Sequence, residues 1–324
     1  MNKRILLLPL MLSTMTLLFA PTSDVSGAAA KAQVVVEAKA SSAVKNDQSP
    51  ATKLPKQTQD RWYWLYSDKN YSKFFDPTSV VVMHSVTGKD KKKIPTEIQA
   101  IIKTGYSYGG AKETIATFGI GEVVTSPNQL ASSIATVSVN PQNRTLQYLK
   151  EDFYDPQGQV VWSRANGAAK EVNSQEFDES FYAAIVDAVF RQGEMERCQA
   201  KDRWIDLWKE SDGKGMLTSA TADTSTMRLR GDNLIFWEWL ERKDAKNNVL
   251  EIKFMKKAVN LPNNTERVII LNYWSPGTNW ETVEDDMAGS YRLIQLKDPD
   301  YKGLVRLQAF AKGYSSWVKR YSLE

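Results

Sequence analysis

From residue 60 onward, most of the chain alternates hydrophobic and polar positions with the two-residue period that is typical of β-strands. The first such stretch, "WYWLYS", places Trp62, Trp64 and Tyr66 on one face of a strand and Tyr63 and Leu65 on the other. One face therefore carries three large rings, and the other carries residues that we expect to enter a core.

Two hairpins are predicted in the segments that follow. A turn signal, "DPTS", precedes the β-branched run "SVVVMHSV" and the charged tip "GKDKKK". The returning strand is "TEIQAIIKTGY", although its spacing also tolerates a helix. The stretch 144–164, "RTLQYLKEDFYDPQGQVVWSR", predicts a further hairpin because Pro and Gly suit its tight turn. The glycine-rich segment 107–127 shows no clear period.

The period changes to that of a helix in 174–198, "SQEFDESFYAAIVDAVFRQGEMERC". Four apolar residues recur there at every fourth position: Phe177, Phe181, Ile185 and Val189. This spacing predicts an amphipathic helix of about five turns, capped by Asn173 or Ser174. Its apolar stripe should cover one face of the preceding sheet.

A second unit begins at 202–212, where "DRWIDLWKESD" echoes the "DRWYWLYSD" of 60–68. Later in this unit, "ERVIILNYWSPGTNW" has the layout of the 144–158 stretch: an apolar strand, an aromatic pair, then a Pro/Gly turn. The last 35 residues alternate to the end, so we predict no second terminal helix and a second unit that is nearly all strand.

The two echoing strands differ on one face only. Their apolar positions are kept, namely Tyr63 and Leu65 in the first unit and Ile205 and Leu207 in the second. On the opposite face, Trp64 corresponds to Asp206. We therefore expect the kept face to be core and the varied face to carry any difference in partner.

Together these patterns predict an α+β fold with two tandem, mostly antiparallel β-sheet domains. The first domain spans 60–198 and is closed by the C-terminal amphipathic helix. The second spans 199–324 and is a diverged repeat of the first.

The N-terminal residues carry the layout of an export signal. In 1–30, Lys3 and Arg4 precede an apolar run and then small residues, which predicts a signal peptide cleaved near 28–30. An uncleaved anchor is the alternative. Residues 31–59 are rich in Ala, Lys, Ser and Pro, which predicts a disordered tether. We expect an exported protein, periplasmic or at the cell surface, with no transmembrane segment after cleavage.

The basic charge does not belong to the two domains. Of the formal net charge of +4, the predicted signal contributes +1 and the tether +3, which leaves 60–324 near zero. A strongly basic face would suggest nucleic acid or an anionic membrane as partner. We therefore expect no nucleic-acid partner.

The chain has few of the residue types that most enzymes use for catalysis. The chain has one histidine, His84, in a strand-like run, and one cysteine, Cys198, after the predicted helix. His84 is best interpreted as a structural or exposed strand residue, and Cys198 as a small or buried thiol, with an intermolecular disulfide as its alternative. We predict no enzyme activity, metal or cofactor. A hydrolase that uses only carboxylates stays open, since paired Asp or Glu leave no local motif.

Aromatic residues are the remaining candidates for function, because their number exceeds what two small cores need. The candidate partner contacts are Trp62, Trp64, Tyr66, Trp208, Trp237, Trp239, Trp274 and Trp280. Half-exposed rings on an exported, near-neutral scaffold suggest contact with host or envelope proteins or with glycans. The alternative is that the helix and the second unit cover them.

The first unit, about 62–190, resembles the surface-adhesin protein E family of exported bacterial proteins. The resemblance rests on "WYWLYSD", "YSKFFDPTSVVV", "EIQAIIK", the hairpin "NRTLQYLKEDFYDPQGQVVWS" and the helix "DESFYAAIVDAVF". Members often carry one Cys before the Arg-Thr-Leu strand and another closing the helix. Here Val139 and Asn140 occupy the first region and Phe190 ends the second, so that disulfide is absent.

The resemblance implies an antiparallel sheet with a packed helix, a surface or periplasmic location and, in some members, binding of host matrix or serum proteins. No binding residue can be transferred from it. Our hypothesis is an exported, non-enzymatic binding module of the cell envelope that contacts protein or glycan through aromatic-bearing sheet faces. The alternative is a structural or stress-related periplasmic protein without a dedicated ligand.

Overall fold

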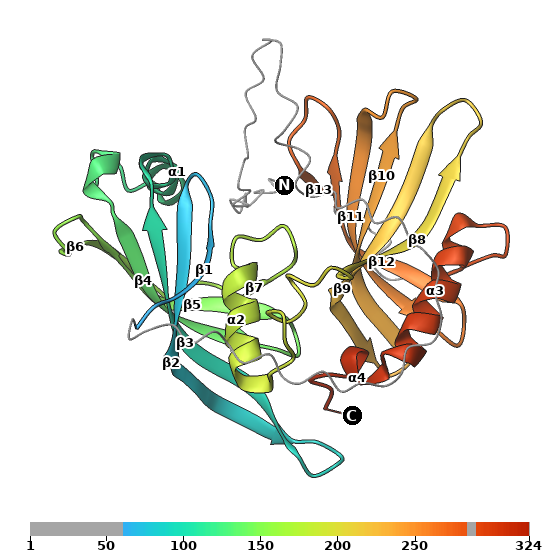
Figure 1. Ribbon diagram of the computed structural model, residues 1–324, viewed down its shortest axis with the longest axis horizontal. Helices are drawn as coiled ribbons and strands as arrows, with labels where there is room; N and C mark the ends of the chain where they lie inside the picture. Colours follow the sequence, from blue (N-terminus) through green and yellow to red (C-terminus); the bar gives the residue numbers. More distant parts are fainter. Residues whose placement is uncertain (1–60, 284–289, 324) are drawn as a thin grey trace, which may run out of the picture. The chain divides into compact units, whose positions relative to one another are not determined.

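The computed structural model describes residues 61–283 and 290–323; the predicted signal peptide and tether lie outside them. Within these ranges the chain forms two seven-stranded antiparallel sheets in tandem, each with helices packed on one face (Figure 1). Both belong to one compact unit. The predicted α+β fold with two β-sheet domains is confirmed.

In the first sheet the strands follow one another in chain order. They are β1 (Tyr63–Ser67), β2 (Tyr71–Thr87), β3 (Lys93–Tyr106), β4 (Ser132–Asn140), β5 (Thr145–Tyr154) and β6 (Val160–Ala165), with the short β7 (Lys170–Glu171) beside β5. Three helices accompany them: α1 (Tyr108–Phe118), the 3-10 helix Pro127–Gln129 and α2 (Glu179–Phe190). Each strand pair is antiparallel.

The second sheet repeats this order. Its strands are β8 (Trp204–Ser211), β9 (Leu217–Arg230), β10 (Asn233–Lys243), β11 (Val249–Asn260), β12 (Thr265–Trp274) and β13 (Glu281–Val283), with the short β14 (Arg292–Leu293) beside β12. The helices α3 (Pro299–Gly313) and α4 (Ser315–Val318) follow. In both sheets the added short strand pairs with the fifth strand of the meander, and a helix comes next.

We call the face of each sheet that its helices cover the inner face, and the opposite face the outer face. The first core joins inner residues of β3 and β4, such as Ile98 and Val137, to Phe181 and Ile185 of α2. The alternation that predicted these strands places every second residue there. A smaller core lies under α1, around Phe153.

The second core has the same construction and corrects one prediction. Leu234 and Phe236 of β10 pack against Leu304 and Leu307 of α3, a terminal helix that we did not expect. Alternation in "LVRLQAF" resembles a strand, but Leu304, Leu307 and Ala311 recur with the spacing of a helix. A proline at the start of α3, where no backbone N–H is required, also favours the helix.

The first domain differs from the predictions, or adds to them, at three places. The helix α2 has 12 residues and begins after Asp178, so Phe177 precedes it. Asn173 does not cap this helix; its side chain accepts a hydrogen bond from Gln175 N in the preceding turn. The glycine-rich 107–127 segment contains α1. "DPTS" is a bulge inside the continuous strand β2, because Asp76 Oδ1 accepts from the Thr78 N–H and hydroxyl and holds the extra residues.

The same bulge recurs in β9 and explains the arginine that the two opening motifs share. Asp223 Oδ1 accepts from the N–H and hydroxyl of Ser225, and the Thr226 hydroxyl accepts from Trp237 N, as Ser79 does from Ile101 N. The arginine of each opening motif then binds the bulge aspartate: Arg61 with Asp76 at 2.7 Å, and Arg203 with Asp223 at 2.8 Å. The two domains are therefore structural repeats.

A second pair of equivalent turns supports the repeat. Arg144 and Asn264 lie in the turns before β5 and β12, and both have a positive φ of 54°. Their carbonyls accept from Val172 N and Ile294 N, each at 2.8 Å. Leu65 and Leu207, which the two opening strands share, are both buried in the cores, at 4% and 2% exposure, as expected for the kept face.

A buried charge cluster lies in the connector between the two domains. Glu196 is fully buried, and its carboxylate accepts from Arg144 at 2.5 Å, from Arg228 at 2.7 Å and from Arg320 at 3.1 Å. Burial opposes ionisation, but the three guanidinium groups outweigh it and lower the pKa of Glu196 to about 2. We call these four residues the Glu196 cluster.

The backbone around Glu196 is a left-handed turn. Glu194, Met195, Glu196 and Arg197 have φ values of 48°, 46°, 54° and 65° in succession. For residues other than glycine this conformation costs about 1–2 kcal/mol each. The strained turn persists because its central carboxylate is fixed by arginines from both domains and from the C-terminal segment.

Asp187 of α2 gives a testable pH dependence at this junction. Its Oδ2 accepts from Glu196 N, whereas its Oδ1 has no hydrogen-bond partner among the described residues, and burial raises its pKa to about 7. The folded protein therefore holds this proton more tightly than the unfolded chain, and stability falls as pH rises from about 4 to about 7.

We expect Asp187→Asn to remove that loss, with a gain on the order of 2 kcal/mol at about pH 8 and little change at about pH 4. Urea unfolding at the two pH values measures the difference. An equal effect at both would show that Asp187 does not titrate in this range.

Candidate functional site: the outer sheet faces

The outer faces are the surfaces that the helices leave uncovered within the described residues. In both domains the helices pack on the inner face only. An outer face is therefore open to a partner where its rings are exposed, as at Trp64, but not at Trp237 and Phe254, which are 3% and 1% exposed.

A continuous row of side chains crosses the outer face of the first domain. Strand register aligns Trp64, Phe74, Lys103, Ile134, Asp152 and Ser163. Trp64 is 50% exposed. Its indole N–H donates to Ser67 Oγ at 2.8 Å, and Ser67 donates to Ser72 at 2.9 Å, so the ring is held in place while its apolar face stays free. A fixed ring loses little conformational entropy when it binds.

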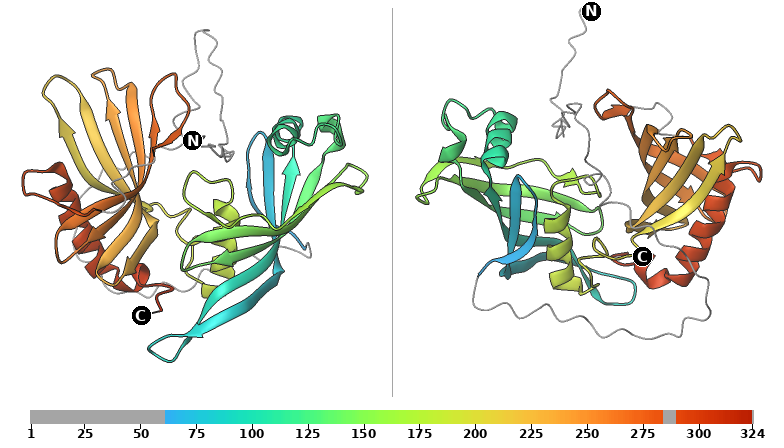
Figure 2. Two further views of the ribbon diagram at one scale, coloured as in Figure 1. Left: turned by 180° about the vertical axis from the view of Figure 1, so that it is seen from behind. Right: turned by 45° about the horizontal axis from the view of Figure 1, so that its top comes forward.

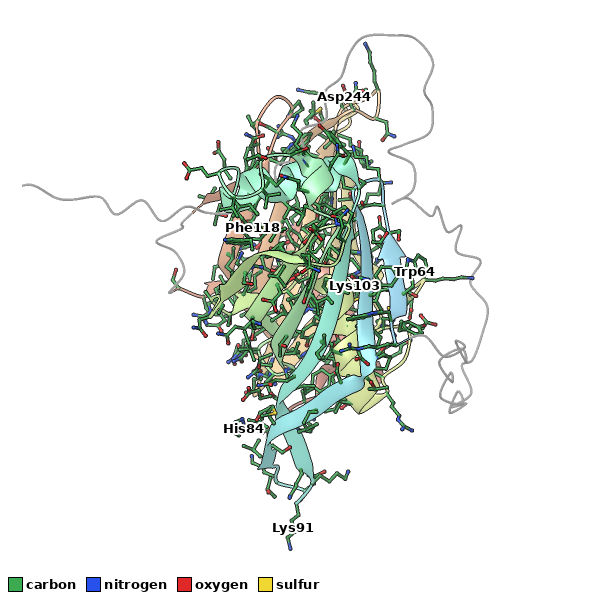
Figure 3. All side chains as sticks on the ribbon, turned by 90° about the vertical axis from the view of Figure 1, so that its left-hand side faces the viewer. Trp64, His84, Lys91, Lys103, Phe118 and Asp244 are labelled. Carbon is green, nitrogen blue, oxygen red and sulfur yellow. The ribbon has the colours of Figure 1, made fainter. Side chains whose placement is uncertain are left out.

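Trp62 extends the same patch. The Arg61 guanidinium lies 5.0 Å from the centre of its ring, and Lys103 Nζ lies 5.6 Å away. Figure 3 looks from the side of the first sheet and shows Trp64, Lys103 and His84 along its length. The aromatic end of this face therefore combines two indoles with two cations, a setting that favours cation–π contacts.

The equivalent row of the second domain carries its rings on different strands. Register aligns Asp206, Thr221, Trp239, Phe254, Asn272 and Thr282. The equivalent bulge residues Asp76 and Asp223 align the two rows position by position. Asp206 therefore occupies the position of Trp64, and Trp239 occupies the position of Lys103. The aromatic content has moved from the edge of the sheet to its middle.

These central rings form an aromatic cluster. Trp237 stacks on Phe254 with 4.5 Å between ring centres, and Trp239 contacts Phe254 at 5.8 Å and Trp280 at 5.9 Å. Trp274 lies next to them, since it pairs with Ile252 on the neighbouring strand. Trp239, Trp274 and Trp280 stay partly exposed.

Three predicted contacts lie elsewhere or are covered. A register shift between Trp64 and Tyr66 turns Tyr66 to the inner face, and there it pairs with Lys73. The same shift in β8 turns Trp208 into the second core, with its indole N–H on Asp300 at 3.0 Å. Trp237 is 3% exposed and donates to Glu171.

The prediction that Tyr66 shares one face with Trp62 and Trp64 is therefore wrong, and Trp208 and Trp237 are covered. Five of the eight candidates lie on the outer faces and are at least partly exposed: Trp62, Trp64, Trp239, Trp274 and Trp280. The register shifts within β1 and β8 explain the positions of Tyr66 and Trp208, because one extra residue reverses the direction of every side chain after it.

The single histidine and the single cysteine lie apart from one another. His84 is an exposed strand residue, as expected, with Nδ1 2.5 Å from Glu97 Oε2. Cys198 belongs to the connector, and burial raises the pKa of its thiol, which disfavours the reactive thiolate.

A group of three carboxylates around Lys257 is buried beneath α3. Lys257 Nζ lies 2.9 Å from Glu238, 3.4 Å from Glu266 and 3.9 Å from Asp300. The adjacent cavity has a volume of about 10 Å³, which is room for about one water molecule. No substrate fits there, so this group does not support a carboxylate hydrolase.

The described residues contain neither a metal-binding cluster nor a helix that could span a membrane. In 61–283 and 290–323, no group of three or more His, Cys, Asp or Glu side chains could hold a metal ion. No helix in those ranges is both long and apolar enough to cross a membrane.

Comparison with known proteins identifies no relative of this chain. No protein-family model matches the chain, and no curated protein matches it. The resemblance to the surface-adhesin protein E family stays a prediction.

Proposed function

We propose that this protein is an exported, non-enzymatic binding module of the cell envelope, which contacts a protein or glycan through the outer faces of its sheets. The observation that carries the proposal is the contrast between the two faces of the repeat. The inner face keeps its apolar core in both copies, whereas the outer row exchanges Trp64 for Asp206 and Lys103 for Trp239. A scaffold that keeps its core and varies one open aromatic face is suited to two different contacts.

Exposure supports the same reading. Trp64 is half exposed, and tryptophan is among the residue types most enriched at the energetic centres of interfaces. The near-neutral charge of 60–324 argues for recognition by shape and apolar contact rather than by charge. Export follows from the signal-like N-terminus.

Site-specific photo-crosslinking in the native cells tests the proposal. We expect p-benzoylphenylalanine at position 64 or 239 to give discrete adducts of the full chain on irradiation. The matched control is position 108, because Tyr108 is an aromatic residue of α1 that is 61% exposed but lies off the outer faces. Position 108 should give none.

The outcomes separate the candidate functions. Absence of adducts at 64 and 239, or equal labelling at 108, would overturn the binding role and favour a structural periplasmic protein without a dedicated ligand. Protease added to intact cells locates the protein. Resistance to it would restrict the partner to the periplasm and overturn a surface-adhesin role.

A further inference from the structure

A polar recess of about 460 Å³ lies on the outer face of the first domain. Its walls come from four neighbouring strands, with His84 from β2, Glu97 from β3, Ser138 and Asn140 from β4, and Thr145 and Gln147 from β5. Glu97 and Lys103 are six residues apart on β3, which places the recess about 20 Å along the face from the aromatic row. Recess and rings therefore share one surface.

The lining is organised by hydrogen bonds around Glu97. Its carboxylate accepts from Ser138 Oγ at 3.2 Å and from Gln99 Nε2 at 3.4 Å, and it lies 2.5 Å from His84 Nδ1. The hydrogen bond from His84 holds the pKa of Glu97 below its usual range. The single acidic group of the recess is thus already engaged on both oxygens.

Other polar groups in the lining have spare capacity. Asn140 uses its Oδ1 for Asn143 N at 2.9 Å, and Gln147 uses its Nε2 for Gly167 O at 2.8 Å. Nothing in the described parts of the chain hydrogen-bonds the Asn140 amide nitrogen, the Gln147 carbonyl oxygen or the Thr145 hydroxyl. The recess therefore offers donors and acceptors side by side, fixed by their own anchoring bonds.

The residues equivalent to the lining differ in the second domain. Shared register places Ala258 where the first domain has Ser138, and Arg267 where it has Gln147. The second domain has no counterpart of His84, because its hairpin is shorter. Asp76 and Ile101 pair across the first hairpin and are 25 positions apart, whereas the equivalent Asp223 and Trp237 are 14 apart.

The extra residues lengthen the β2–β3 hairpin into an arm, which Figure 2 shows projecting beyond the neighbouring strands. The arm supplies one wall of the recess. An insertion specific to one repeat that builds a site is a common way for a repeated scaffold to gain function.

The chemistry of the lining selects one class of ligand. No lysine or arginine lines the recess, and Glu97 would repel an anion, so phosphate and sulfate groups are disfavoured. Ala169 is the single lining residue without a polar side chain, which disfavours an apolar anchor. Hydroxyl groups both donate and accept, and so match carboxamides and threonines in any orientation.

We propose that the outer face of the first domain binds a neutral glycan in extended form, with one sugar in the recess and further sugars along the sheet toward Trp62 and Trp64. The inference rests on the proposed function, because it names the ligand class of the same surface. The recess supplies hydrogen bonds, and the indole faces supply apolar area for the less polar faces of the sugars.

Isothermal titration of the full chain tests this directly. The probes are chitotetraose, cellotetraose and maltotetraose as neutral chains, and a heparin tetrasaccharide as the anionic chain. We expect at least one neutral tetrasaccharide to bind and the heparin fragment not to bind. Gln147→Ala and Thr145→Val should each weaken that binding about tenfold, since each removes one hydrogen bond to the ligand.

Thr265→Val is the matched control, because Thr265 occupies the position of Thr145 in the second domain. It should leave the affinity unchanged. Equal loss with Thr265→Val, binding of the heparin fragment alone, or no binding of any neutral chain at millimolar concentration would each overturn the inference. In the last case, persistent crosslinks from position 64 would leave the proposed function standing and assign the face to a protein. Glycan binding without crosslinks from position 64 would leave the glycan inference standing and would overturn only the contact at Trp64.

Discussion

Replacing Glu196 with glutamine is expected to lower the free energy of unfolding by about 3–5 kcal/mol. The substitution removes the carboxylate that Arg144, Arg228 and Arg320 share, and it leaves three buried guanidinium groups with one fewer counter-charge. The left-handed turn would also lose the contact that holds it. Because domains are stable by only about 5–15 kcal/mol, the midpoint of urea unfolding should fall strongly.

The exposed neighbour Glu194 provides the control, since it belongs to the same left-handed turn. Glu194→Gln should change the free energy of unfolding by no more than about 0.5 kcal/mol. The pKa of Glu196 is depressed in the folded state, so its stabilisation is present above about pH 4.5 and is lost as pH falls toward 2. If the wild type and Glu196→Gln lose stability in parallel over that range, the cluster does not stabilise the fold as described.

Asp223→Ala should cost about 3–5 kcal/mol, whereas Asp76→Ala should cost only about 1–3 kcal/mol, although the two residues are equivalent in the repeat. Both fix the bulge of their second strand. They differ in the arginine left behind: the Arg203 side chain is 10% exposed, and the Arg61 side chain is 56% exposed. Water can solvate Arg61 after the change, whereas the buried Arg203 keeps only Glu179, at 2.5 Å, as a counter-charge.

Urea unfolding of the two variants of the full chain measures this difference. Equal losses would show that the hydrogen bonds within each bulge dominate and that the arginine contributes little. A larger loss for Asp76→Ala would contradict the assignment of Arg203 and Asp223 as the more buried pair.

Periodicity predicted most strands because one residue in two enters a core, and burial imposes that pattern directly. It failed for α3, in which a helical spacing of Leu304 and Leu307 coincides with short-range alternation. It also failed at "DPTS", because the same residue types favour a turn and a bulge. Here the side chain of Asp76 binds Thr78 in place of backbone pairing, and the strand continues.

The candidate site was predictable in composition but not in arrangement. Trp62 and Trp64 could be assigned to one face from alternation alone. Tyr66 and Trp208 could not, because the bulge before each is set by pairing with the next strand. Phe254 and the polar recess were missed for a related reason: both depend on which residues of distant strands become neighbours, and alternation carries no information about register.

The last residues of the chain complete the core of the first domain. Tyr321 belongs to that core and contacts Phe190 with 4.4 Å between ring centres, while Arg320 reaches Glu196. These residues follow the whole second domain in sequence, so the first domain depends on a segment that is synthesised after the second. A truncation that removes them should therefore expose Phe190 in the first domain, far from the deletion in sequence.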